Sequence, residues 1–88
     1  MHEHSLLNDL MRKIERVVRE QNAQRATKVT IKLGAFSHIS PDHFKEHFDQ
    51  AKPGTVAENA ELEVYASDDQ SDPMAQEMIL ESLEVEQA

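Results

Sequence analysis

Histidine is the residue type in this sequence that brings the most chemistry. Five of the 88 residues are histidines, and two of them, His2 and His4, fall within the first four positions. The amine of Met1, the backbone nitrogen of His2 and the His2 imidazole can chelate one metal ion together, and such nitrogen ligands in a square plane suit Ni(II) or Cu(II). Glu3 or His4 would close the fourth position. The alternative is a solvated chain end that binds nothing.

A second histidine pair, His43 and His47, has the spacing of neighbours on one helix face. Helical zinc sites use the same spacing, but a zinc protease needs a glutamate directly after the first histidine, and Phe44 stands there instead. Phe44 and Phe48 form an apolar stripe on the same segment. We therefore interpret the two histidines as the polar border of a core-facing helix.

No pattern in the sequence indicates an enzyme. Two glycines and no cysteine leave neither a glycine-rich phosphate loop nor a thiolate nucleophile. The net charge of −8 argues against nucleic acid as a partner, because an acidic surface repels phosphates. No apolar run approaches the roughly 18 residues that span a membrane, and a signal peptide is not apparent. We expect a cytoplasmic protein with no membrane contact.

Hydrophobic periodicity predicts two helices and three strands. The helices are expected at about 6–22 and 41–51, and the strands at 28–36, 61–66 and 78–86. Ser5 and Ser40 are the expected helix N-caps, and Gly34 marks the end of the first strand or a bulge. The last strand changes phase near Ser82.

This element order predicts an α+β fold with the chain order α-β-α-β-β. Two amphipathic helices would cover one face of a three-stranded mixed sheet, which gives a two-layer domain over residues 1–88. Met74 and Met78 are expected to fill gaps in the core rather than to bind metal.

Four stretches resemble the HypA/HybF family of nickel metallochaperones. They cover nearly the whole chain in order, and together they are specific although each alone is weak: MHEHSL, VTIKLGAFSHISPDHFKEHF, GTVAENAELEV and ESLEVE. The second stretch contains residues 34–37, which match the family's G-x-x-S turn.

The resemblance implies a protein that assists nickel insertion into [NiFe]-hydrogenase, and in some organisms into urease. The family's nickel site is amino-terminal, which implies Met1, His2 and Glu3 as ligand residues here. His4 stands where the family usually has an apolar residue, so it could add a ligand. The implied partners are a nickel enzyme precursor, such as a hydrogenase large subunit, and a HypB-like GTPase. Formation of a homo-oligomer stays open.

One departure from the family is large. The family inserts a zinc domain held by two CxxC pairs before its last strand, whereas this sequence has no cysteine and only the short loop 67–73 at that point. We therefore expect no zinc site. Two alternatives stay open beside nickel delivery: a metal-free interaction module with the same fold, and a copper or zinc site built from His2 and His4 with His38.

Overall fold

The computed structural model describes the backbone of residues 3–87 and the side chains of residues 5–87. Over this range the chain forms two helices and three strands, in the predicted order: α1 (Glu3–Glu20), β1 (Ala23–Leu33), α2 (Pro41–Ala51), β2 (Glu61–Ala66) and β3 (Met78–Gln87). The predicted α+β class is confirmed. No helix of the described part is long and apolar enough to cross a membrane.

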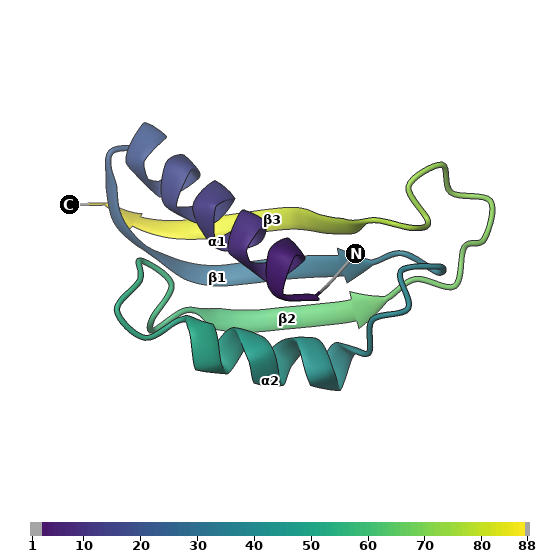
Figure 1. Cartoon of the computed structure of the whole chain (residues 1–88). Helices are drawn as coiled ribbons and strands as arrows, with labels where there is room; N and C mark the ends of the chain where they lie inside the picture. The colour runs from purple at the N-terminus through teal and green to yellow at the C-terminus, as the bar shows by residue number, and fades with distance from the viewer. Residues whose placement is uncertain (1–2, 88) are drawn as a thin grey trace.

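The three strands form one mixed sheet in the order β2-β1-β3. The central strand β1 runs parallel to β2, with Val29 opposite Leu62, and antiparallel to β3, with Val29 opposite Leu83. Figure 1 shows α1 lying across β1 and β3 while α2 runs beside β2. The start of α1 points toward the end of the sheet where β1 and β2 finish and β3 begins.

The core lies between the sheet and the two helices. Alternate residues of β1, namely Val29, Ile31 and Leu33, are fully buried on the helix-covered face. Phe44 and Phe48 reach this core from α2 with ring centroids 6.3 Å apart. The buried residues of α1 have helical spacing and complete the layer: Leu7, Leu10, Ile14 and Val18. The prediction of two amphipathic helices on one face is confirmed.

Short sequence patterns predicted the bounds of α2 and β2 correctly. Ser40 caps α2 as predicted, with its hydroxyl accepting the N–H of His43 at 3.5 Å, and Pro41 takes the first helical position. Strand β1 ends at Leu33, immediately before Gly34. The prediction of Ser5 as an N-cap was wrong, because α1 begins at Glu3. A serine costs little inside a helix, so it does not fix where the helix starts.

Pairing with β3 explains the remaining differences in β1. The strand begins at Ala23 rather than at residue 28, because Ala23 pairs with Gln87 at the far end of β3. In β3 itself the register moves from Ser82 to Leu80 across consecutive β1 residues, which leaves Glu81 as an extra residue. This bulge accounts for the predicted change of phase near Ser82.

Candidate metal centre

The predicted metal site lies at the very start of the chain. Met1 and His2 lie outside the described residues. The backbones of Glu3 and His4 form the first positions of α1, and their side chains are also outside the described part. The structure therefore locates the helix that would carry the site, and the ligand set stays a prediction.

A cleft of about 680 Å³ adjoins the first turns of α1. Three segments that are distant in the sequence form it: the start of α1, the loop between β1 and α2, and the segment that enters β3. The residues lining it are Leu6, Phe36, Ser37, His38, Ile39, Gln76, Glu77 and Met78. The cleft combines apolar walls with one imidazole and one carboxylate.

Backbone hydrogen bonds fix the two loops that form this cleft against each other. The N–H of Gly34 donates to the Glu77 carbonyl at 2.9 Å, and the N–H of Phe36 donates to the Ala75 carbonyl at 2.7 Å. A Cβ atom at Gly34 would lie 2.2 Å from the Ala75 oxygen. Glycine at this position allows the backbones of these two segments to approach closely.

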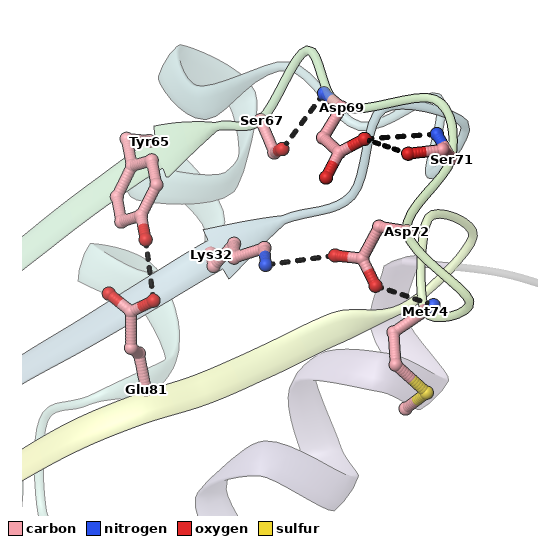
Figure 2. A network of polar contacts seen from close by, with 8 residues as sticks. All are labelled: Lys32, Tyr65, Ser67, Asp69, Ser71, Asp72, Met74 and Glu81. Atoms are coloured by element: carbon pink, nitrogen blue, oxygen red, sulfur yellow. Dashed lines mark hydrogen bonds and ion pairs between the residues drawn. The ribbon is translucent and has the colours of Figure 1, made fainter.

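Polar contacts hold the segment between β2 and β3, as Figure 2 shows. Asp72 accepts the N–H of Met74 at 2.9 Å and the ammonium of Lys32 at 2.9 Å, and these two hydrogen bonds lower the pKa of Asp72. The hydrogen bond to Asp72 raises the pKa of Lys32. The hydroxyl and N–H of Ser71 donate to Asp69 and lower the pKa of that carboxyl group. Both aspartate carboxylates therefore stabilise the loop between β2 and β3.

A further carboxylate, that of Glu81, accepts a hydrogen bond on the face of the sheet that the helices leave uncovered. The Tyr65 hydroxyl donates to Glu81 at 2.5 Å, between the two outer strands and across β1 (Figure 2). This hydrogen bond raises the pKa of Tyr65. Across residues 5–87 no three His, Asp or Glu side chains gather closely enough to hold a metal ion. The part of the chain with described side chains therefore does not form a complete metal site by itself.

The three histidines with described side chains lie in two different places. His43 and His47 are on α2 with ring centroids 6.2 Å apart, beside the buried Phe44 and Phe48. This placement agrees with their interpretation as a polar helix border. His38 instead lines the cleft next to α1. The sequence contained no signal for this placement, because it depends on how the β1–α2 loop meets the segment before β3.

The two methionines near the cleft differ in burial. Met78 packs partly buried against the core, as predicted. Met74 is 47% exposed, so the prediction that it fills the core was wrong. Its backbone N–H donates to Asp72 in the turn before β3, so the residue belongs to the loop rather than to the strand.

The amino-acid sequence matches a known protein family and several of its members. A family model described as "Hydrogenase/urease nickel incorporation, metallochaperone, hypA" matches residues 1–72. The hydrogenase maturation factor HypA of Aquifex aeolicus is 44% identical over 62 residues, which are 70% of this chain and 54% of that protein. HypA of Archaeoglobus fulgidus is 34% identical over 64 residues, 73% of this chain and 58% of its own length. The chain thus spans little more than half the length of these curated relatives.

Two solved structures share the fold. The solution structure of the nickel metallochaperone HypA from Helicobacter pylori superposes with a TM-score of 0.82 at 19% identity, covering 100% of both chains. A second structure, described as the solution structure of HypA protein, gives a TM-score of 0.74 at 20% identity and covers 97% of this chain and 96% of its own. At these identities the likeness concerns the fold alone.

The matched residues define the class of protein, the family whose model is described by nickel incorporation, and the solved structures add that the fold is the same. The chain belongs to the HypA family. This membership confirms the resemblance seen in the sequence, and with it the prediction that the chain is not an enzyme. The 88 residues contain no cysteine, so they cannot form the four-cysteine zinc site of the family.

Proposed function

We propose that this chain binds Ni(II) at its amino terminus and delivers it to the precursor of a nickel enzyme, such as a [NiFe]-hydrogenase large subunit. One observation carries the proposal: the match to the nickel-incorporation family begins at residue 1 and includes the Met1-His2-Glu3 sequence. The Met1 amine and the His2 backbone and imidazole nitrogens supply three ligands, and Glu3 or His4 is the candidate for the fourth. Nickel is the cargo of this protein.

The fold supports this role by anchoring the chelating residues. Helix α1 begins at Glu3 and buries one face against the sheet, so a metal bound by the preceding residues stays attached to a rigid element. Release requires no catalysis. Ligand exchange transfers the ion when a partner offers higher affinity or a better-completed coordination shell.

The delivery partners are part of the proposal. A HypB-like GTPase and the enzyme precursor are the partner classes that the family implies, acting in the cytoplasm. Because the 88 residues contain no cysteine, no thiolate of this chain holds the cargo. Any partner contact that relatives make through a zinc domain must therefore be made by other surfaces here.

Calorimetric titration with Ni(II) tests the proposal. The protein with a free Met1 amine is compared with the same protein carrying an acetylated amine, which removes one ligand and leaves every side chain in place. His2→Ala is the second variant. We expect binding by the native protein and loss of binding in both altered forms. Equal binding by all three would refute the amino-terminal site.

Two further outcomes separate the alternatives. If Cu(II) or Zn(II) occupies the site at a matched free concentration and Ni(II) does not, the nickel assignment fails. If the native protein binds no metal, the HypA fold here serves a protein contact. Charge reversal at Glu84 or Glu86, both exposed on the edge strand β3, would then weaken partner binding.

A further inference from the structure

Strand β3 has one edge that no other strand of the described chain covers. It is the last strand in the order β2-β1-β3, and its ten residues pair with β1 alone among the described residues. Over the same range, no backbone hydrogen bond joins β3 to a segment outside the sheet. The other edge strand, β2, has six residues, and α2 runs beside it (Figure 1). The outward N–H and C=O groups of β3 are therefore open to pairing with an added strand.

An apolar groove accompanies this edge on the face of the sheet that the helices cover. It has a volume of about 130 Å³ and lies between α1 and the start of β3, lined by Leu6, Asp9, Leu10, Lys13, Met78 and Leu80. Four apolar residues of β3 pack against the core but are only partly buried: Met78, Leu80, Leu83 and Val85. An added strand that brought apolar side chains to this face would complete their burial.

Charge on the uncovered face of the sheet decides which kind of strand fits. Glu84 is exposed and lies opposite Lys28 in the register, and among the described residues its carboxylate has no hydrogen bond or ion pair. Glu81 and Glu86 are exposed as well, and each accepts a hydrogen bond from a side chain of this chain. The sequence after residue 52 contains no Lys or Arg. Because like charges opposite each other destabilise a sheet, a second copy of β3 does not fit this edge, whereas a strand with cationic side chains does.

We propose that the open edge of β3 binds an extended segment of a partner protein in which Lys or Arg alternates with apolar residues. Successive side chains of a strand point to opposite faces, so the apolar ones reach the groove beside α1 and the cationic ones reach Glu84. This inference rests on the proposed function and deepens it, because it assigns the contact with a delivery partner to a surface that requires no zinc domain.

A synthetic peptide in which lysine alternates with valine is the probe, with ten residues to match the length of β3. The control peptide has the same sequence with methylated backbone nitrogens, which keeps the charge and removes the N–H donors of the ladder. Glu84→Lys is the test variant of the protein. Glu58→Lys is its matched control, because Glu58 is also exposed, lies in the loop before β2 and gives the same change in net charge.

Fluorescence anisotropy measures the affinity for the peptide, and amide hydrogen exchange locates the bound strand. We expect the native protein to bind the unmethylated peptide only, with slower exchange of the β3 amides and no change in β2. Glu84→Lys should lower the affinity about fivefold, since it turns an attractive cross-strand pair into a repulsive one, and Glu58→Lys should lower it less. Circular dichroism checks that each variant is folded.

Three results would overturn this inference: no binding of the unmethylated peptide, equal binding of the methylated peptide, or equal weakening by Glu58→Lys and Glu84→Lys. The last two would mean that the protein senses overall charge rather than an added strand. The peptide needs no metal, so protein with an acetylated Met1 amine should bind it as the native protein does. Nickel binding without peptide binding therefore refutes this inference alone, and peptide binding without nickel binding refutes the proposed function alone.

Discussion

The N–H of Gly34 donates to the carbonyl of Glu77 at 2.9 Å, which joins the end of β1 to the segment that enters β3. The Ala75 carbonyl lies so close to Gly34 that an added Cβ atom would be 2.2 Å from its oxygen. The Ala75 oxygen is a backbone atom, so it cannot move away from an added Cβ as the end of a flexible side chain could. This contact joins the two segments that contribute residues to the cleft beside α1.

We expect Gly34→Ala to lower the free energy of unfolding by about 3 kcal/mol, toward the upper end of the range for overpacking. Gly54→Ala is the control. A Cβ there meets nothing within 4 Å, but the φ of +80° costs about 1 kcal/mol for a residue with a side chain. Urea unfolding followed by circular dichroism measures both values. Equal costs would show that the two loops can separate without penalty.

Lowering the pH should reveal how much the ionised Asp72 carboxylate contributes to the stability of the fold. Its folded-state pKa is lowered by the hydrogen bonds from Met74 and Lys32, so the folded chain holds fewer protons on this carboxyl than the unfolded chain. The stabilisation is complete above the unfolded pKa of about 3.9 and is lost as the pH falls through the lower folded value. Asp72→Asn should therefore be less stable than the native protein at pH 7, and the difference should shrink toward pH 2.

Thermal unfolding at several pH values measures this difference. Asp68→Asn is a suitable control, because Asp68 is an exposed residue of the same segment. We expect this control to follow the native protein across the range. A constant difference between Asp72→Asn and the native protein at all pH values would mean that packing, rather than the charge of Asp72, supports the loop.

The parts of the fold that the sequence predicted well are those with local signals. Ser40 and Pro41 start α2, and β2 shows simple alternation of polar and apolar residues. The first residues of β1, before Lys28, were missed because their strand conformation comes from pairing with β3, at the other end of the sequence. Two irregularities in β1, at Gln24 and Thr27, break the alternation there, so no short window of sequence shows the periodicity of a strand.

The candidate site shows the same division between local and distant information. The Met1-His2 chelate is local, because its ligands are neighbours in the chain, and the sequence alone suggested it. The position of His38 is not local. It depends on the contact of Gly34 with Ala75 and on α1 crossing the sheet, and neither feature leaves a mark in the residues around His38.

The core prediction can be tested with two phenylalanines of different burial. Phe48 is 0% exposed and Phe36 is 41% exposed. We expect Phe48→Ala to cost about 3–5 kcal/mol, because it removes buried apolar surface and leaves a cavity between α2 and the sheet. Phe36→Ala should change stability by no more than about 0.5 kcal/mol. Urea unfolding checks both, and a large cost at Phe36 would mean that it packs more closely than its exposure indicates.

Nickel should stabilise the folded chain only to the extent that the folded chain binds it more tightly than the unfolded chain. Met1 and His2 are adjacent in sequence, so their chelate persists after unfolding and contributes little to this difference. A ligand that reached the metal only in the folded state and raised the affinity tenfold would raise the free energy of unfolding by about 1.4 kcal/mol at saturating nickel.

Urea unfolding with and without saturating Ni(II) measures this gain, and a chelator gives the metal-free reference for each protein. We expect the native protein to gain well under about 1.4 kcal/mol from nickel, because its proposed ligands are neighbours in the chain, and His2→Ala to gain nothing. A gain of about 1.4 kcal/mol or more would mean that a residue which lies near the metal only in the folded state also binds it.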